Sequence, residues 1–247
     1  MATLLLSDLH LKPELPHLAH ALTGWLQKTA PGAGAVYVLG DLFEAWPGDD
    51  DAADPFNAPI IAAFRALTDG GVPLYFQHGN RDSLLGAEFE RLTGGRLLPE
   101  EYVVRLDGTP TMLMHGDQLC TDDFAYQTFR TQVRNPAWQQ VLLRQPLAAR
   151  KQLAGEMREG SAAAKSEKTM AIMDVNPDAV ADAFRRTGVT RLIHGHTHRP
   201  ARHVHEVDGR ICERIVLADW RETGAYLEIA ADGVLAHTIL PEPDSGG

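Results

Sequence analysis

Two absences narrow the class of protein to which this sequence belongs. The chain of 247 residues has only two cysteines, Cys120 and Cys212, which are too few for a disulfide framework or a thiolate metal site. It has no apolar run near the roughly 20 residues that a membrane-spanning helix needs, and Met1 leads almost directly into a predicted strand rather than into a signal peptide. We therefore expect a cytoplasmic protein in a reducing setting.

An excess of positive charge is also missing, because the formal net charge is −10. That balance argues against a general nucleic-acid binder. The charge is unevenly spread: residues 124–173 carry eight Arg and Lys against three Glu, so this segment is +5 and the remainder −15. A basic segment in an acidic protein predicts an anionic partner at that segment. The length suits one large domain, or one domain with a sizeable insertion.

The first strand is predicted at Leu4-Leu5-Leu6, a short apolar run that is bounded by polar residues. Asp8 and His10 follow at its C-terminal end, where open α/β sheets bind ligands. Because Asp8 and His10 are two positions apart, their side chains lie on the same side of an extended chain. An Asp-x-His pair alone is also common as an ordinary polar strand end, so its meaning depends on the partners that the rest of the chain supplies.

The first half of the chain alternates predicted strands and helices. A helix over 14–28 carries His17 and His20, which we expect to face solvent. A strand over 35–39 then ends at Gly40-Asp41, and, after a helix over 57–68, a strand over 72–77 delivers His78-Gly79-Asn80-Arg81-Asp82. This β-α-β-α-β order predicts a largely parallel sheet with one rim crowded by Asp, His and Asn.

The second half is predicted to contain a lid and a second sheet. Strands over 102–106 and 111–114 flank the hairpin signal at 107–108 and lead into His115, and a helix over 177–186 with a strand over 191–193 leads into His194-Gly195-His196-Thr197-His198. Between them, residues 122–174 have no strand pattern and predict two to four inserted helices. Asp-Gly pairs at 208–209 and 232–233 predict hairpins of a second sheet that covers the first. We expect a core of residues 1–121 and 175–247 and a lid of residues 122–174.

The predicted strand ends supply two carboxylates, one amide and four imidazoles: Asp8, His10, Asp41, Asn80, His115, His196 and His198. Oxygen and nitrogen donors without thiolates suit Mn²⁺, Fe²⁺ or Zn²⁺. The long separations between them exclude a zinc finger that is built from local pairs. Seven donors exceed what one ion with open positions can use, so the set predicts two ions about 3.5–4 Å apart that clamp a phosphoryl group and activate water.

The order of these motifs resembles that of the calcineurin-like metallophosphoesterases, and longer stretches resemble the UDP-2,3-diacylglucosamine diphosphatase family of lipid A biosynthesis. The shared motifs are Asp8-x-His10, Gly40-Asp41, Gly79-Asn80-Arg81-Asp82, His115-Gly116-Asp117 and Gly195-His196-Thr197-His198, and the longer stretches span residues 40–46, 115–117, 119–123, 172–176 and 193–200. The resemblance runs from Met1 to about Ile239. It implies an α/β fold, a sandwich of two β-sheets flanked by helices with an inserted helical lid.

The resemblance also implies an activity: hydrolysis of the pyrophosphate of UDP-2,3-diacylglucosamine, by water attack on the α-phosphorus, to UMP and 2,3-diacylglucosamine 1-phosphate (lipid X). It implies two Mn²⁺ ions, the first held by Asp8, His10, Asp41 and His198 and the second by Asp41, Asn80, His115 and His196, with Asp41 as the bridge. Asn80, Arg81 and His115 are the implied catalytic residues. His194 lies inside the strand end, and we interpret it as a packing residue.

Arg81 stands where many relatives in the superfamily have a histidine that protonates a departing alkoxide. Arginine stays charged at any working pH and cannot do so. Its presence suits a leaving group that needs no proton, such as a phosphate whose second pKa is about 6. We expect Arg81 to form a fork on phosphate oxygens. A salt bridge to Asp82 or Glu44 is the competing interpretation.

The resemblance implies that eight residues contact the substrate: Asn80, Arg81, Asp122, Tyr126, Ser161, Lys165, Lys168 and His196. Lys165 departs from the family, where we expect asparagine. The lid interleaves apolar side chains with arginine, which predicts contact with an anionic membrane surface. The resemblance implies that this surface is the cytoplasmic face of the inner membrane of a Gram-negative bacterium. An amphipathic subdomain that packs on its own core is the alternative for any one of these residues.

Two other functions stay open from the sequence. A related phosphodiesterase or phosphatase could act on a soluble nucleotide, although the apolar, basic lid argues against it. A catalytically dead relative could serve as a scaffold, although all seven predicted ligands are present. The acidic run at residues 49–51 is either a solvated loop or part of the rim of the site.

Overall fold

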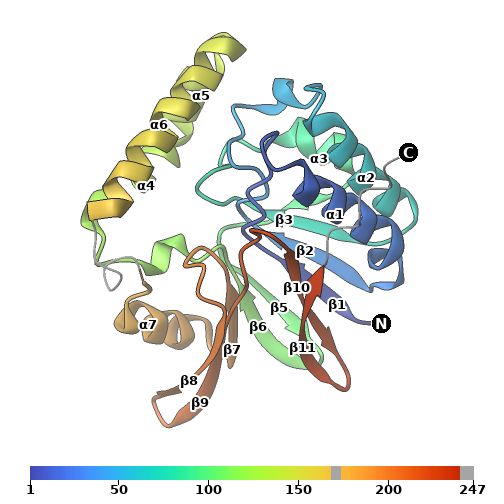
Figure 1. The fold of residues 1–247 in the computed structure, drawn as a ribbon. Helices are drawn as coiled ribbons and strands as arrows, with labels where there is room; N and C mark the ends of the chain where they lie inside the picture. The colour runs from blue at the N-terminus through green and yellow to red at the C-terminus, as the bar shows by residue number, and fades with distance from the viewer. Residues whose placement is uncertain (168–173, 240–247) are drawn as a thin grey trace.

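The computed structural model describes residues 1–167 and 174–239, except for the side chains of residues 159 and 161–167. Two β-sheets pack face to face, helices cover the outer face of each, and a group of three helices stands at one end (Figure 1).

The first sheet has six strands in the order β11-β10-β1-β2-β3-β4. They are β1 (Thr3–Leu6), β2 (Ala35–Leu39), β3 (Leu74–Gln77), β4 (Arg96–Leu97), β10 (Gly224–Ala230) and β11 (Gly233–Ile239). Strands β1 to β4 are parallel, so the carboxyl ends of β1, β2 and β3 meet at one edge. Strand β10 pairs antiparallel with β1, and β11 pairs antiparallel with β10.

The second sheet has five strands in the order β5-β6-β7-β9-β8. They are β5 (Tyr102–Leu106), β6 (Thr109–Leu113), β7 (Arg191–His194), β8 (Ala201–Val207) and β9 (Arg210–Val216). The three central strands are parallel, and the two edge strands pair antiparallel with their neighbours. The chain leaves β6 and β7 toward the same end of the molecule at which β1 to β3 finish (Figure 1).

Three apolar layers hold this arrangement together, because successive side chains of a strand face opposite sides. Leu4 and Leu6 of β1 pack toward helices α1 (Pro16–Lys28), α2 (Asn57–Asp69) and α3 (Ala87–Thr93), whereas Leu5 packs between the two sheets. On the far side, Met112 and Leu192 of the second sheet pack with Phe184 of α7 (Pro177–Thr187). Short 3₁₀ helices lie at Ala30–Gly32, Asp49–Asp51 and Asp117–Leu119.

The segment predicted to form a lid, called the lid below, contains α4 (Phe124–Val133), α5 (Pro136–Leu143) and α6 (Leu147–Glu167). The Asp123 carboxylate caps α4 by accepting a hydrogen bond from a backbone N–H group, and the Asn135 amide oxygen caps α5 in the same way. Val133 is the one buried side chain of α4, and α5 buries none. Among the described residues, no helix combines the length and the hydrophobicity that a membrane-spanning segment needs.

The sandwich of two sheets with flanking helices is confirmed, as are the helices and strands that periodicity predicts and the hairpins at residues 208–209 and 232–233. The predicted parallel sheet with a polar rim is confirmed for β1 to β3, and His115 and His196 reach the same site from strands of the second sheet. One expectation was wrong. Of the last four strands only β8 and β9 join the second sheet, whereas β10 and β11 extend the first. An Asp-Gly turn pairs two strands with each other and carries no signal for the sheet that they enter.

Candidate metal centre

The strand ends reach the site through unusual backbone geometry. Five of the seven predicted ligands have φ between 48° and 66°, the left-handed region that non-glycine residues rarely adopt: Asp8, His10, Asp41, His196 and His198. Such residues gather at functional sites, where the surrounding fold holds them. Here the β1 and β2 extensions bond to each other, with Asp8 N–H donating to the Gly40 carbonyl at 3.1 Å and His10 N–H to that of Asp41 at 3.0 Å.

Two glycines let the carboxylates approach the backbone. A Cβ atom at Gly79 would overlap Oδ1 of Asp41, and one at Gly195 would overlap Oδ2 of Asp8. In the space that they leave, Asp41 Oδ1 accepts the Arg81 N–H at 2.8 Å and Asp8 Oδ2 accepts the His196 N–H at 2.9 Å. The second oxygen of each carboxylate is thereby aimed at the centre.

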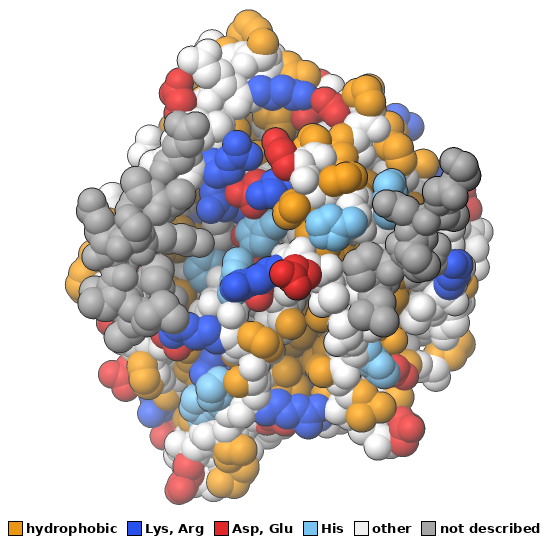
Figure 2. Space-filling view, viewed as in Figure 1, with side chains coloured by type: hydrophobic (Ala, Val, Ile, Leu, Met, Phe, Trp, Pro, Cys, Tyr) orange, Lys and Arg blue, Asp and Glu red, His pale blue; other side chains and the backbone are white. Residues whose placement is uncertain are grey.

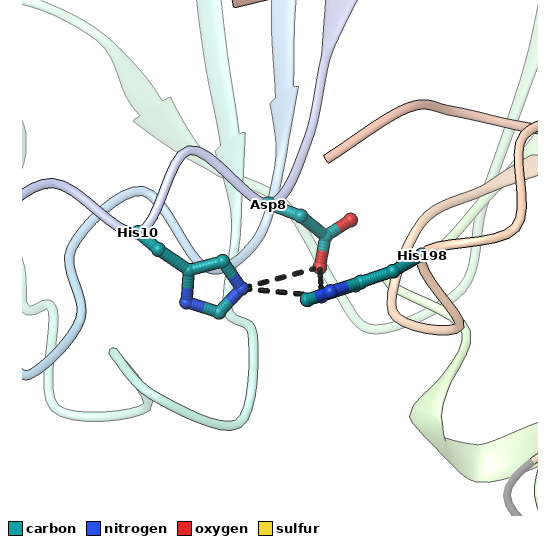
Figure 3. Close-up of side chains that lie close together, drawn as sticks. All are labelled: Asp8, His10 and His198. Carbon is teal, nitrogen blue, oxygen red and sulfur yellow. Dashed lines mark hydrogen bonds and ion pairs between the residues drawn. The ribbon is translucent and has the colours of Figure 1, made fainter. Parts of the chain in front are cut away.

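Asp8, His10 and His198 form one group of donors (Figure 3). The Nε2 atoms of the two histidines lie 3.2 Å apart, and Oδ1 of Asp8 lies 3.4 Å from Nε2 of His198 and 3.9 Å from that of His10. This Oδ1 atom is fully buried and accepts no hydrogen bond. A buried carboxylate oxygen without a donor is costly, and a divalent cation between the three side chains would satisfy it.

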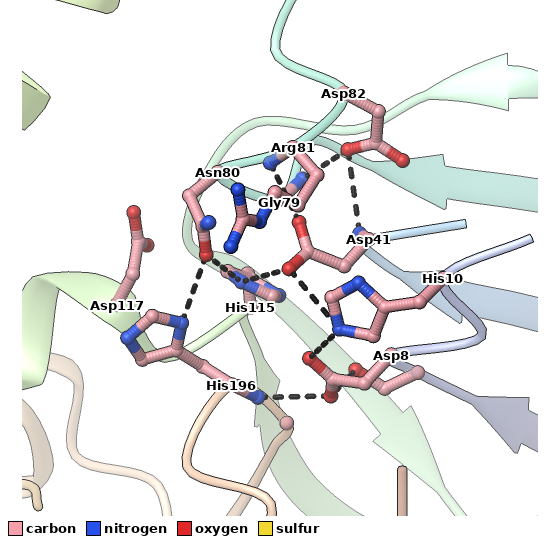
Figure 4. Close-up of polar contacts among 12 residues, drawn as sticks. Asp8, His10, Asp41, Gly79, Asn80, Arg81, Asp82, His115, Asp117 and His196 are labelled. Carbon is pink, nitrogen blue, oxygen red and sulfur yellow. Dashed lines mark hydrogen bonds and ion pairs between the residues drawn. The ribbon is translucent and has the colours of Figure 1, made fainter. Parts of the chain in front are cut away.

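Asp41, Asn80, His115 and His196 form the adjoining group (Figure 4). Oδ1 of Asn80 lies 3.2 Å from Nε2 of His115 and 3.0 Å from Nδ1 of His196. Oδ2 of Asp41 lies 3.8 Å from Nε2 of His115 and 3.7 Å from Nε2 of His10, so it faces both groups. The structure thus brings all seven predicted ligands together. Their oxygen and nitrogen donors fit a pair of divalent cations that share Asp41.

Three of the histidines predicted to bind metal have partners that were not predicted from the sequence. Nδ1 of His198 lies 3.2 Å from Asp219, Nδ1 of His10 lies 3.0 Å from Glu44, and Nδ1 of His115 donates to the Leu39 carbonyl at 2.9 Å. Such contacts fix which ring nitrogen faces a metal. Glu44 lies in the motif at residues 40–46, but no motif includes Asp219. Asp219 approaches His198 because the segment after β9 returns past Asp8.

The pKa values of individual side chains in the centre are shifted in opposite directions. Burial opposes the charge of Asp8, but contact with His198 and the charges of three nearby histidines outweigh it and lower the pKa of Asp8. Burial likewise works against the charge of His198, yet Asp219 and Asp8 raise its pKa to about 9. Burial and the neighbouring His115 lower the pKa of His196 to about 4. His196 is therefore neutral at physiological pH and ready to bind a cation, whereas His198 must first lose a proton.

Asp82 and His194 support the site from behind it. The buried Asp82 carboxylate accepts the N–H groups of Gly79 at 2.7 Å and Leu42 at 2.8 Å, which ties the β2 and β3 loops together. Nδ1 of the buried His194 donates to the Gly195 carbonyl at 2.8 Å, and Nε2 accepts a hydrogen bond from Arg214 at 3.0 Å. Burial and that arginine lower the pKa of His194 to about 3. Both ring nitrogens are occupied, in agreement with its interpretation as a packing residue.

A cavity runs from the metal centre to the lid. It has a volume of about 720 Å³, including space that is open to solvent. Asn80 and Arg81 line the end beside the predicted ligands, and the walls combine apolar side chains from the core and from all three lid helices: Trp46, Leu84, Tyr126, Phe129, Val133, Trp138, Leu142, Leu153 and Met157.

The predicted substrate contacts fall in different places. The Tyr126 ring lies 5.7 Å from that of His196, and its hydroxyl donates to Asp117 at 2.8 Å. Asp122 is exposed and accepts a hydrogen bond from Asn176 at 2.8 Å. The side chains of Ser161 and Lys165, and all of Lys168, lie outside the described part of the chain.

Four basic residues in the described part of the lid segment contact the core, which the net charge of the segment did not predict. Arg130 lies 2.8 Å from both Asp117 and Glu100, and Arg134 donates to the carbonyl groups of His78 and Gly79. Arg150 and Lys151 contact acidic residues of the 49–54 loop. These four residues therefore join the segment to the core.

A sandwich whose strand ends present seven oxygen and nitrogen donors, with a shared carboxylate between two groups, defines a metallophosphoesterase. The family model "Calcineurin-like phosphoesterase" matches residues 1–200. A UDP-2,3-diacylglucosamine hydrolase of Stenotrophomonas maltophilia (strain K279a) is 47% identical, covering 98% of this chain and 100% of the relative, and that of Pseudomonas paraeruginosa is 50% identical with the same coverage. The chain belongs to the calcineurin-like phosphoesterase family, in its branch of UDP-2,3-diacylglucosamine hydrolases. A solved dimetal phosphatase from Danio rerio shares the fold, with a TM-score of 0.51 and 14% identity over 98% of this chain and 99% of its own.

Proposed function

We propose that this protein hydrolyses the pyrophosphate of UDP-2,3-diacylglucosamine, giving UMP and 2,3-diacylglucosamine 1-phosphate. The observation that carries the proposal is the continuity between the metal centre and the apolar cavity. Asn80 and Arg81 border both, so a phosphate at the centre would place an attached acyl chain among Trp46, Phe129 and Met157. A soluble nucleotide would leave this apolar surface without a partner.

The chain's own residues would position the diphosphate. The backbone of Arg81 is fixed to Asp41 at 2.8 Å, so its guanidinium starts from an anchor at the shared carboxylate. A planar fork of N–H donors matches phosphate oxygens and stabilises the charge that develops on them. Because Arg81 gives up no proton, it suits a phosphate leaving group. Tyr126, beside His196, closes the lid side of the same space.

Two Mn²⁺ ions are the proposed cofactors, with the first held by Asp8, His10, Asp41 and His198 and the second by Asp41, Asn80, His115 and His196. Bound there, they would supply Lewis acidity and an activated water. Removing metal with a chelator should abolish hydrolysis, and adding Mn²⁺ should restore it. Mn²⁺ should also raise the melting temperature, because a free ligand concentration of 100 times Kd adds about 2.7 kcal/mol to the free energy of unfolding. The scaffold alternative would be favoured if the purified protein held well below two metal ions per chain and added Mn²⁺ did not raise that content.

The lid contacts are also proposed: Asp122, Tyr126, Ser161, Lys165 and Lys168 would contact the glucosamine and phosphate groups. The decisive position is Lys165, which departs from the family pattern. A Lys165→Ala variant should lower kcat/KM by about tenfold, as the loss of one charged contact to phosphate does. An unchanged kcat/KM would remove this residue from the site.

We propose a peripheral position at the cytoplasmic face of the inner membrane, from which such a lipid must be taken. Exposed apolar side chains of the lid support it: Phe124 is 78% exposed and Val141 is 61% exposed, with Leu143 and Arg144 beside the latter. Helices of this kind lie at anionic bilayer surfaces. Sedimentation with phosphatidylglycerol vesicles should therefore fall for a Phe124→Ser/Val141→Ser variant. Equal binding of this variant would contradict the proposed membrane surface.

The direct test incubates the protein with UDP-2,3-diacylglucosamine and Mn²⁺ and measures UMP. A matched reaction with unacylated UDP-glucosamine tests the alternative of a soluble nucleotide substrate. The proposal expects the diacylated substrate to be strongly preferred, and equal rates on both would reject it.

A further inference from the structure

The acidic loop at residues 49–51 is anchored to the core by its first residue. The Asp49 carboxylate accepts the N–H groups of Gly86, Glu88 and Phe89 at 3.0–3.1 Å, at the start of α3. It also accepts the indole N–H of Trp46 at 3.0 Å. A carboxylate at a helix N-terminus satisfies unpaired N–H groups and the helix dipole. The loop and Trp46 therefore share one rigid support.

The next residue of this loop meets the lid. The Asp50 carboxylate accepts hydrogen bonds from both terminal nitrogens of Arg150, which belongs to α6. Nη1 lies 2.9 Å from Oδ1, and Nη2 is in close contact with Oδ2. Nη1 also donates to the Pro47 carbonyl at 2.5 Å, and Nε to the Gln145 carbonyl at 2.9 Å. Arg150 is 4% exposed. Its guanidinium thus lies buried between the lid and the core and bonds to both.

The loop is shaped to receive this guanidinium. Gly48 has φ of 140°, and a Cβ atom there would overlap Nη1 of Arg150. The following lid residue repeats the contact at the surface, with Lys151 Nζ lying 2.6 Å from Asp51 and 2.9 Å from Asp54. Each residue of the acidic run therefore has a partner, which favours ordering of the rim over a merely solvated loop.

These contacts lie beside the apolar cavity. Trp46 and Pro47 line it from the core, and Leu153 and Met157 line it from α6, three and seven residues after Arg150. Residues at these spacings lie on the same face of a helix. The contact between Arg150 and Asp50 thus sets how far the two walls stand apart.

We propose that Asp50 and Arg150 form a clasp that positions α6 over Trp46, which makes Arg150 a positioning residue for binding of the acyl chains. The clasp rests on the proposed function for its effect on catalysis, but its structural effect can be measured without substrate. Neither side chain belongs to the predicted metal ligands, so loss of the clasp weakens substrate binding and leaves the chemical step intact.

Arg150→Met keeps the length of the side chain and removes the fork, and Asp50→Asn removes the partner charge. For each variant we expect KM for UDP-2,3-diacylglucosamine to rise about tenfold, with kcat changed by less than about twofold, because each substitution weakens the charge-assisted hydrogen bonds between the buried Arg150 guanidinium and the exposed Asp50 carboxylate. Arg150→Lys should be intermediate, since a point charge replaces the fork. Arg65→Met, which removes an arginine from an exposed ion pair on α2, should change neither constant.

Amide hydrogen exchange provides the readout that a general loss of stability does not mimic. Residues 147–158 of α6 should exchange about tenfold faster in Arg150→Met, whereas α1 and α2 should keep their wild-type rates. Unchanged KM and unchanged exchange would overturn the clasp. So would a fall in kcat and melting temperature with KM unaltered, which would mark Arg150 as only structural. A wild-type protein that cannot hydrolyse the substrate would reject the proposed function, whereas the exchange rates of α6 would still decide the clasp.

Discussion

The sheet rim buries its charged side chains, whereas the lid exposes many of its apolar ones. Asp8, Asp41 and His115 are at most 2% exposed, and each is fixed by left-handed backbone, a neighbouring glycine or a backbone carbonyl. Phe124 and Val141 of the lid face solvent, and the inward contacts of the lid include several ion pairs with the core. The difference fits the two proposed tasks, because reacting groups need fixed positions, whereas the proposed cover over acyl chains must admit a bulky ligand.

The largest effect should come from the shared carboxylate. Asp41→Ala or His115→Ala should lower turnover by at least about 10³-fold, because a two-ion centre fails when one ligand set is broken. The exchange rates of the lid should stay as they are, since these residues do not contact it. His20→Ala, at an exposed histidine, is the control. Retained turnover in either variant would contradict the two-metal account.

A smaller but large effect is expected from the glycine that makes room for Asp8. A Gly195→Ala Cβ would displace the Asp8 carboxylate and should reduce activity by about 10²-fold, the cost of misplacing reacting groups by about 1 Å. Gly155→Ala in α6 adds the same atom where nothing lies within 4 Å, and it should have no effect. If both variants kept wild-type kcat/KM, close packing would not be what fixes the rim.

A third prediction concerns Asp219, which contacts His198 on the side away from the proposed metal ions. Asp219→Asn should weaken Mn²⁺ affinity about 10-fold to 100-fold, the usual cost of losing the partner of a ligand histidine. Isothermal titration of the metal-free protein measures it. Asp208→Asn, which alters a surface pair with Arg185, is the matched control. Equal affinities in the two variants would remove Asp219 from the centre.

The smallest effect should distinguish the forces that hold the two regions. Raising the salt concentration to 1 M shortens the screening length to about 3 Å. Amide exchange of α6 should then rise several-fold, whereas exchange of α1, which buries six apolar or aromatic residues, should not change. A uniform response of both helices would indicate that apolar packing holds the lid as well.

Much of the fold and of the centre could be predicted because the signals are local. Leu4-Leu5-Leu6 reads as a strand from its own composition, and Asp8 and His10 follow directly from its end. The assignment of strands to two sheets could not be predicted, because Leu113 and Leu5 are equally apolar and pack against the same layer from opposite sides. Nor could Asp219, whose approach to His198 depends on where the segment after β9 returns. The ion pairs of Arg130 and Arg150 with the core could not be predicted either, because a net charge does not say which way a side chain points.

The cap that Asp49 places on α3 also bears on the order in which the protein assembles. The loop that receives Arg150 takes its shape from N–H groups that converge only after α3 has formed beside the first sheet. Residues 147–158 therefore have no docking point on an unfinished core. Arg150 lies 100 residues from Asp50, and its docking point exists only after α3 has packed on the first sheet. The lid should therefore close onto the core late in folding.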